Sequence, residues 1–271
     1  MDKNDLTKLQ VVKDITVRAK ISDYFKEAAM TSLPYEIQDG ERPETLSHRV
    51  YGRADLHWLI LLFNEIQDPT FEWPLSSAEM EDYLSEKYKG YAMYYPDTAR
   101  IPDAFQLQDI LRLNGAKTIH QMLSDGSMVS ANILKWDPTY NKIIIDGEEA
   151  SMFDPTFLDP MEEETGYARI FLDENTENHL CFSRLQPHQF AVHHFESNDG
   201  AVLDPRQGPP SEPTNPSSIL NRYVTETGFV EVVAVDNRTY EQNKNDERRL
   251  IRMVKPEFVS AIQTQFRSIF N

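Results

Sequence analysis

The helix expected over residues 54–63 constrains this chain most, because it is apolar nearly all the way round. On a helical wheel its large side chains form two opposite stripes: Leu56, Leu59, Ile60 and Phe63 on one side, and Trp58, Leu61 and Leu62 on the other. Burying one such side chain is worth roughly 1.5–3 kcal/mol, against about 5–15 kcal/mol for the net stability of a domain. Both stripes therefore need cover, either from the rest of the chain, the commoner case, or from a partner.

The residues before this helix predict a strand, a turn and a second helix. Residues 35–37 alternate as a short strand does, and Gly40 is typical of a turn. Pro43 suits the first position of a helix, where a missing N–H costs nothing, and Gly52 marks the end of that helix after Tyr51. Nearer the N-terminus, Ser22 predicts the start of a helix to about residue 30, and after the module residues 76–90 predict another helix.

This order of elements, with the segments GERPETLSHRVYG and LHWLILLFN, resembles the LysM-like module in the baseplate wedge subunit of T-even-type contractile-tailed phages. The resemblance covers residues 14–90 and 225–271. Within it, the positions that match are Tyr35, Gly40, Pro43, Leu46, Tyr51, Gly52, Leu56, Trp58, Asn64, Asp68, Pro69 and Trp73.

The resemblance implies a non-catalytic structural subunit in the baseplate of a virion, assembled in the host cytoplasm. Its partners would be other wedge proteins and neighbouring wedges of a sixfold ring, with the sheath-initiating protein close by. Large apolar side chains dominate interface energetics, so the candidate partner-binding residues are Trp58, Leu61, Leu62, Phe71 and Trp73. The residues expected to build the module itself are Tyr35, Gly40, Pro43, Leu46, Tyr51, Gly52, Asn64 and Pro69.

Composition limits the other function classes. The net charge of −17 disfavours binding to nucleic acid or to an anionic membrane surface. No run approaches 18 apolar residues, so we expect a soluble chain without a membrane span. The single cysteine, Cys181, cannot form an internal disulfide, which fits a reducing cytoplasm.

The middle of the chain reads differently from its ends. Residues 91–204 carry 7 basic and 19 acidic residues, a net charge of −12, and short apolar runs alternate with Asn-Gly and Asp-Gly turns. We predict an α+β protein with a LysM-like N-terminal module and helical flanks, an inserted small antiparallel β domain, and a C-terminal β-hairpin plus helix. The expected segments are an arm and helix (1–34), the module with its following helix (35–90), the acidic β domain, a barrel or sandwich (104–204), a Pro-rich linker (205–218), and C-terminal strands and helix (219–271).

No sequence pattern selects a catalytic site, a metal site or a cofactor, and we expect none. Adjacent His193 and His194 would point to opposite faces of a strand and could not easily share an ion. His179 and Cys181 share a strand face, but no third group orients them for nucleophilic chemistry.

The alternative function is a LysM-type module that binds peptidoglycan. Against it, the segment after Asn64 lacks the proline-bounded final strand of glycan-binding modules.

Overall fold

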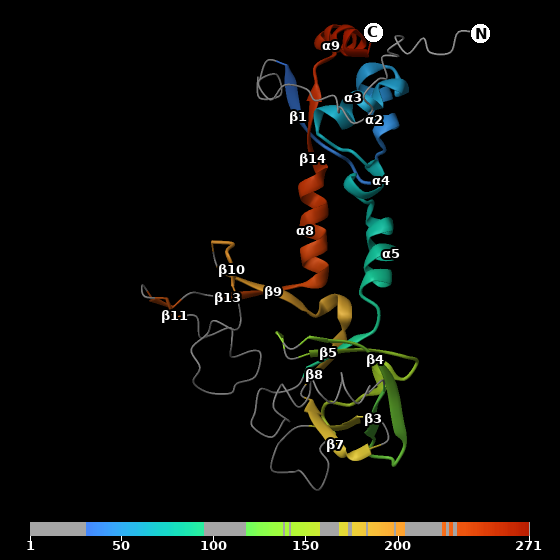
Figure 1. The fold of residues 1–271 in the computed structure, drawn as a ribbon, viewed down its shortest axis with the longest axis vertical. Helices are drawn as coiled ribbons and strands as arrows, with labels where there is room; N and C mark the ends of the chain where they lie inside the picture. Colours follow the sequence, from blue (N-terminus) through green and yellow to red (C-terminus); the bar gives the residue numbers. More distant parts are fainter. Residues whose placement is uncertain are drawn as a thin grey trace, which may run out of the picture. The chain divides into compact units, whose positions relative to one another are not determined.

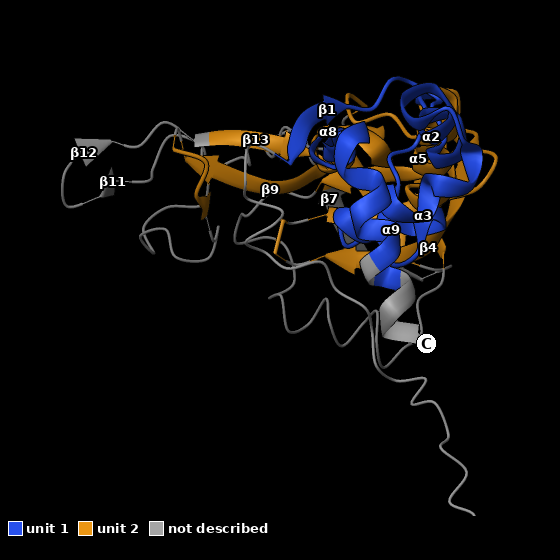
Figure 2. Ribbon diagram, turned by 90° about the horizontal axis from the view of Figure 1, so that it is seen from above, with its two compact units in different colours: residues 1–77, 245–271 blue, residues 78–244 orange. Residues whose placement is uncertain are grey.

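The structure of the chain is a computed structural model. It describes residues 31–94, 118–137, 139–140, 142–157, 168–172, 175–182, 184–197, 199–203, 224–225, 228–229 and 232–270. Two compact units are present: residues 1–77 with 245–271 form unit 1, and residues 78–244 form unit 2 (Figure 2). The helix expected from Ser22 to residue 30 and the linker expected over residues 205–218 lie outside the described residues.

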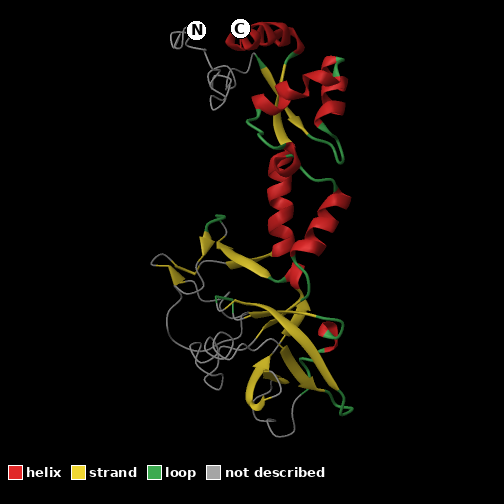
Figure 3. Cartoon of the chain, turned by 45° about the vertical axis from the view of Figure 1, so that its right-hand side comes forward, coloured by secondary structure: helices red, strands yellow, loops and turns green. Residues whose placement is uncertain are grey.

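Both helices and strands build the chain, which confirms the α+β class (Figure 3). Unit 1 is the more helical of the two. Its elements are β1 (Ser32–Glu36), α2 (Pro43–Tyr51), the 3-10 turn η1 (Ala54–Leu56), α3 (His57–Phe63), α4 (Pro69–Glu72), β14 (Leu250–Val254) and α9 (Pro256–Phe270). No helix in the described part of the chain is long and apolar enough to cross a membrane.

The two strands of unit 1 come from opposite ends of the sequence. β1 and β14 pair antiparallel, with Tyr35 opposite Ile251 and Leu33 opposite Met253 (Figure 1). The predicted C-terminal β-hairpin is therefore wrong, because its second strand pairs with residues 32–36 rather than with residues 232–236. The residues expected to form the connecting loop are instead helix α8 (Asn237–Arg249).

Helix α2 begins and ends where its sequence predicts. Pro43 occupies the first turn, and Gly52 ends the helix in the left-handed region, with φ of 71°. The N–H of Gly52 donates to the carbonyl of His48, which satisfies one of the carbonyls that a helix end leaves open. The chain then turns directly into η1 and α3, so the two helices expected before residue 64 are both present.

The core of unit 1 has two neighbouring parts. One part lies beneath the β1–β14 pair and contains Ile37, Leu46, Ile60, Trp73, Ile251 and Met253. The other joins α3 to α9 and contains Leu56, Leu59, Phe63, Val254, Val259 and Ile262. α9 begins at Pro256, as predicted, and lays its apolar stripe against α3.

Unit 2 is built mainly from antiparallel strands. The large sheet has seven strands in the order β7-β6-β3-β4-β5-β2-β8, and every neighbouring pair runs antiparallel. Its strands are β2 (Tyr91–Tyr94), β3 (Thr118–Met122), β4 (Met128–Asp137), β5 (Lys142–Asp146), β6 (Ala168–Leu172), β7 (Asn175–Phe182) and β8 (Arg184–Pro187).

The two edges of this sheet belong to one stretch of chain. β7 ends at Phe182 and β8 begins at Arg184, yet β7 pairs with β6 at one edge while β8 pairs with β2 at the other. Because only one residue connects these two edge strands, the two edges of the sheet come together in space. The sheet therefore closes on itself. Of the two forms expected for the β domain, a barrel or a sandwich, the register favours the barrel.

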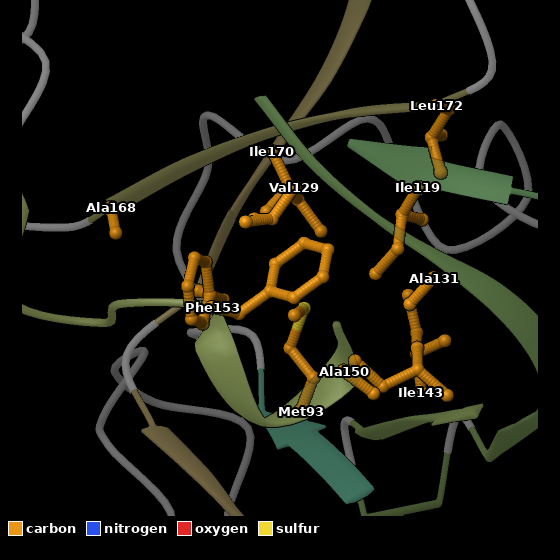
Figure 4. Close-up of a cluster of buried hydrophobic side chains, with 12 residues drawn as sticks. Met93, Ile119, Val129, Ala131, Ile143, Ala150, Phe153, Ala168, Ile170 and Leu172 are labelled. Carbon is orange, nitrogen blue, oxygen red and sulfur yellow. The ribbon is translucent and has the colours of Figure 1, made fainter. Parts of the chain in front are cut away.

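The interior of the barrel is apolar and drawn from all its strands. Side chains alternate between inside and outside, so that Ile143 and Ile145 point into the core while Ile144 packs outside against Ala92, Tyr94 and Ala191. Figure 4 shows the inner residues converging around Phe153. Phe153 and Ala150 come from the turn around η2 (Ala150–Met152), which follows β5 and fills the barrel.

A smaller sheet, β10-β9-β13, completes the larger elements of unit 2. Its strands are β9 (Val192–Ser197), β10 (Val202–Leu203) and β13 (Val232–Asp236); the short pair β11 (Val224–Thr225) and β12 (Gly228–Phe229) and the turn η3 (His188–Phe190) are also present. Helices α5 (Ser77–Lys87) and α8 both continue past the unit limits, which fall after Ser77 and after Lys244.

A buried carboxylate links α5 to α8 within unit 2. Glu241 is 6% exposed and accepts hydrogen bonds from Lys87 Nζ at 2.7 Å, Tyr88 Oη at 2.9 Å and Tyr83 Oη at 3.2 Å. Burial by itself raises the pKa of this carboxyl, but the hydrogen bonds from Lys87 and Tyr88 outweigh burial and hold the pKa below its ordinary value. Glu241 is therefore a charged, fully partnered part of the fold.

Candidate partner-binding surface

Helix α3 has one buried and one half-buried face, as its wheel predicts. Leu56, Leu59, Ile60 and Phe63 are between 0 and 3% exposed. Trp58, Leu61 and Leu62, on the other side, are only half-buried. The difference matters because the second face is the one we expected to meet a partner.

The chain itself covers part of that second face. The ring of Trp58 lies 4.7 Å from the ring of Phe266 in α9, with the planes tilted by 33°. Such aromatic pairs contribute about 0.5–1.5 kcal/mol beyond the area they bury. Trp58 is thus partly used by the fold of unit 1, and α9 takes part of the role that we had expected of a partner.

The two leucines of the same face differ in their surroundings. Leu61 packs against the core cluster that contains Leu46, Ile60 and Trp73. Leu62 is half-buried and belongs to none of the core clusters found among the described residues. Leu62 therefore remains the better candidate of the two for contact with another protein.

Phe71 is the most exposed of the candidates. It lies in the short helix α4, where Pro69 occupies the first turn and the Asp68 carboxylate caps the helix by accepting from the Thr70 N–H at 2.9 Å. The Phe71 side chain is 73% exposed. An aromatic side chain held this far into solvent by a capped helix is typical of an interaction site.

Trp73 belongs to the fold of unit 1. It is 7% exposed, lies in the core beneath the β1–β14 pair, and donates its indole N–H to the carbonyl oxygen of Glu41 at 2.7 Å. A buried indole with its N–H satisfied has no face left for another protein. This placement removes Trp73 from the candidate partner-binding residues.

The residues expected to build the module lie in its core, in its turns and in its internal hydrogen bonds. Leu46 is fully buried, and Gly40 and Gly52 both hold positive φ, at 70° and 71°. Tyr35 donates its hydroxyl hydrogen to Glu41 Oε2 at 2.8 Å, and Tyr51 donates to the carbonyl of Val254 at 3.0 Å. Burial raises the pKa of the Tyr51 hydroxyl to about 12.

Asn64 connects the end of α3 to β14. Its side-chain Nδ2 donates to the carbonyl oxygens of Ile60 and Arg252, each at 2.9 Å, and its Oδ1 accepts from the Arg252 N–H at 2.8 Å. A carboxamide used in this way imitates a neighbouring strand. It therefore fixes α3 against a strand from the far end of the sequence.

Sequence reasoning missed a second set of polar contacts at the other end of β14. Asn245 exchanges two hydrogen bonds with the backbone of Leu75, at 2.8 and 3.0 Å. Arg249 reaches both Asp39 Oδ1 and the Leu75 carbonyl, each at 3.1 Å. The only available signal was the spacing of Asn237, Glu241 and Asn245, four residues apart, which places three buried polar groups on one face of α8.

We expected His193 and His194 to point to opposite faces of a strand, but the structure brings their rings together. The register between β9 and β13 shifts at Val235/Asp236, leaving His193 as an extra residue in β9. The two Nδ1 atoms consequently lie 2.9 Å apart, and His193 stacks on Tyr240. Across the described residues, no group of three or more His, Cys, Asp or Glu side chains could hold a metal ion. The side chains of His179 and Cys181 lie outside the described part.

Comparison with known proteins bears directly on unit 1. Residues 4–92 match the family described as base plate wedge protein 53. The expected resemblance to baseplate wedge proteins is confirmed. A curated relative, baseplate wedge protein gp53 of Enterobacteria phage T4, is 35% identical over 69 residues, which cover 25% of this chain and 35% of the relative. The chain thus spans about a third of the length of the baseplate wedge protein that it matches.

Proposed function

We propose that this chain is a structural, non-catalytic subunit of a phage tail baseplate wedge that joins wedge proteins and neighbouring wedges during assembly of a contractile tail. The observation that carries the proposal is the match of residues 4–92 to the base plate wedge protein 53 family, supported by the 35% identity to the phage T4 wedge protein. The partners would be other wedge proteins in a sixfold ring, with the sheath-initiating protein nearby, and the site of action would be the tail of the virion.

The proposed joining surface is the exposed part of unit 1 around Phe71 and Leu62. Both side chains are apolar and retain solvent exposure, although the rest of the module has a well-formed core. The strand, two helices and antiparallel strand formed by β1, α2, α3 and β14 are what we propose as the LysM-like module. Its last strand arrives only at residues 250–254, so the module is completed by the C-terminal segment.

The test is assembly of the purified full chain with its wedge partner proteins, followed by size-exclusion chromatography. Phe71→Ser and Leu62→Ser should each weaken co-elution at least tenfold in apparent affinity, while the circular dichroism and melting temperature of the free chain stay unchanged. Leu250→Ser is the matched control, because Leu250 is 71% exposed in the same unit but lies on β14. Normal assembly of both test variants would overturn the proposed surface.

Trp58→Ala is a less clean test, because Trp58 packs on Phe266 and its loss weakens the fold itself.

Peptidoglycan binding, the alternative, gains no support from the family match. Purified peptidoglycan should not retain the full chain in a pull-down. Strong, saturable retention would replace the wedge proposal with the glycan-binding one.

A further inference from the structure

Two consecutive histidines meet in the small sheet of unit 2. His193 is the extra residue of β9, and the bulge brings its ring against that of His194. The two Nδ1 atoms lie 2.9 Å apart, and the ring planes make an angle of 85°. His194 is 7% exposed, and His193 is half-buried. The contact is thus part of the folded sheet and does not join two freely moving surface side chains.

The contact can form only while one of the two Nδ1 atoms lacks a hydrogen. A hydrogen bond between two nitrogens needs one N–H and one lone pair. The Nε2 of His194 carries a hydrogen, because it lies 2.6 Å from Glu196 Oε1 and a carboxylate only accepts. Neutral rings, or rings with one extra proton between them, still present one N–H and one lone pair at Nδ1. With two extra protons, both Nδ1 atoms carry hydrogens and the bond is lost.

A metal ion between the two rings fits less well than a proton. Two nitrogens that bind one tetrahedral zinc ion at about 2.0–2.1 Å lie about 3.3 Å from each other. The observed 2.9 Å between the Nδ1 atoms is instead a typical hydrogen-bond length. Over the stretches of chain that the structure describes, no group of three His, Cys, Asp or Glu side chains could complete a metal site.

The histidine pair also holds a tyrosine of α8. His193 stacks on the ring of Tyr240, with the ring centroids 3.8 Å apart and the planes at 11°. The start of α8 is fixed separately: the backbone N–H of Asn237 donates to the carbonyl of Ala191 at 2.9 Å, and its Nδ2 donates to the carbonyl of His188 at 2.8 Å. These two bonds involve no imidazole nitrogen. Loss of the histidine contact therefore separates His193 from Tyr240 without releasing the start of α8.

The surroundings of His193 disfavour a second positive charge. Burial lowers the pKa of His193, and the adjacent His194 lowers it further. Among the charged groups nearby, Glu241 of α8 raises this pKa, whereas Lys142 of β5 and Lys87 of α5 lower it. A proton consequently binds His193 more readily once the contact is broken. The contact is favoured above the ordinary pKa of 6.5 and becomes less favoured as the pH falls through the lowered pKa.

We propose that His193 and His194 form an acid-sensitive switch between the bulge of β9 and α8. The switch is closed while the pair carries at most one extra proton. It opens when both rings are charged, because the two Nδ1 hydrogens and the two positive charges then repel each other. On opening, His193 leaves Tyr240 and uncovers one face of its ring. This inference concerns unit 2 alone and does not depend on the proposed joining surface of unit 1.

The test is an NMR titration of the histidine rings in the full-length chain, from pH 8 to pH 4. The signals of His193 and His194 should move together in two steps at least about one pH unit apart, because strongly interacting groups titrate as a pair. Stacking on Tyr240 should shift the His193 ring protons upfield through the upper step, and this shift should vanish in the lower step. Unchanged amide signals of β5 over the same range would separate opening of the switch from unfolding.

Two single variants distinguish a coupled pair from two independent rings. In His193→Asn and in His194→Asn, the remaining histidine should titrate in one step. In His194→Asn, the step of His193 should also move to higher pH than the lower step of the parent, because the neighbouring charge is gone. His48→Asn, at an exposed position of unit 1, is the matched control and should leave both steps in place.

Four results would overturn the proposal. They are independent titration of the two rings in the parent, two steps that persist in either single variant, a His193–Tyr240 stack that survives the lower step, and loss of the coupling on addition of EDTA. The last result would mean that a metal ion, and not a proton, lies between the rings.

Discussion

Asn64 and Arg252 are joined by two hydrogen bonds between a side chain and a backbone, although 188 positions separate them in the sequence. The Asn64 carboxamide donates to the Arg252 carbonyl and accepts from the Arg252 N–H. The end of α3 and the strand β14 are thus fixed to each other by one side chain, and the C-terminal segment becomes part of a module that begins at residue 32.

Asn64→Ala should lower the free energy of unfolding of unit 1 by about 1–3 kcal/mol, because it leaves backbone groups of Arg252 without their partner. Chemical denaturation followed by tryptophan fluorescence measures this change, since two of the three tryptophans of the chain, Trp58 and Trp73, lie in unit 1. Ser260→Ala, at an exposed position of α9, should change the denaturation midpoint little. An equal midpoint for the two variants would contradict the role given to Asn64.

Gly90→Ala should strongly destabilise unit 2. Gly90 has φ of 78°, and a Cβ there would overlap the carbonyl oxygen of Ile145 in β5. We expect a loss of at least about 2 kcal/mol, because left-handed strain alone costs about 1–2 kcal/mol. Gly126→Ala is the matched control: φ is 82°, but no atom lies within 4 Å of the added Cβ. Thermal melts should show a clearly larger loss at Gly90 than at Gly126.

Glu241→Gln should lower the free energy of unfolding of unit 2 at neutral pH by about 1–3 kcal/mol. The free energy of unfolding of the variant should also fall less than that of the parent as the pH is lowered. The pKa of Glu241 lies below its ordinary value of 4.5, so its carboxylate stabilises the fold above that pH. This contribution is lost as the pH falls through the lowered pKa. Urea denaturation between pH 7 and pH 3 measures the effect, with Glu86→Gln at an exposed position of α5 as the control. Parallel curves for parent and Glu241→Gln would contradict the assignment.

Tyr51→Phe should cost unit 1 about 0.5–1.5 kcal/mol at neutral pH, because the hydrogen bond to the Val254 carbonyl is lost. Burial raises the pKa of Tyr51 to about 12, above its ordinary value of 10.0. Its contribution is therefore complete below pH 10 and declines as the pH rises towards 12. Denaturation midpoints at pH 8 and pH 11 should consequently lie closer together in the variant than in the parent.

The local elements of unit 1 were predictable because their signals lie within a few residues. Pro43 and Gly52 mark the ends of α2, and the four-residue stripe from Leu56 to Phe63 identifies the buried face of α3. The partner of β1 was not predictable in the same way, since its strand lies beyond the whole of unit 2. Nothing near residues 250–254 indicates that they pair with residues 32–36 rather than with the preceding strand.

Helix α8 was missed for a different physical reason. Its sequence, NRTYEQNKNDERR, has no apolar stripe, so hydrophobic periodicity predicts a loop. The face that it buries is polar, with Asn237, Glu241 and Asn245 each between 4 and 6% exposed. A helix can pack through such a face when every buried group has a partner, but only the folded chain reveals those partners.

Sequence reasoning could identify the candidate residues of the site but not which of them the fold buries. A large apolar side chain can serve either the fold or a partner, and the sequence does not distinguish Trp73, which is in the core, from Phe71, which is in solvent. The cover over Trp58 comes from Phe266, at the other end of the chain. Burial decided by distant segments is the part of such a site that local patterns cannot predict.

The contact between Leu75 and Asn245 has an evolutionary consequence. Because these residues exchange two hydrogen bonds, the points where the chain leaves unit 1 and returns to it are neighbours. The entropy needed to close a loop between fixed neighbours grows only slowly with the length of the loop. Such a junction should tolerate the gain, loss or exchange of the segment between its two sides, while the fold of unit 1 is kept.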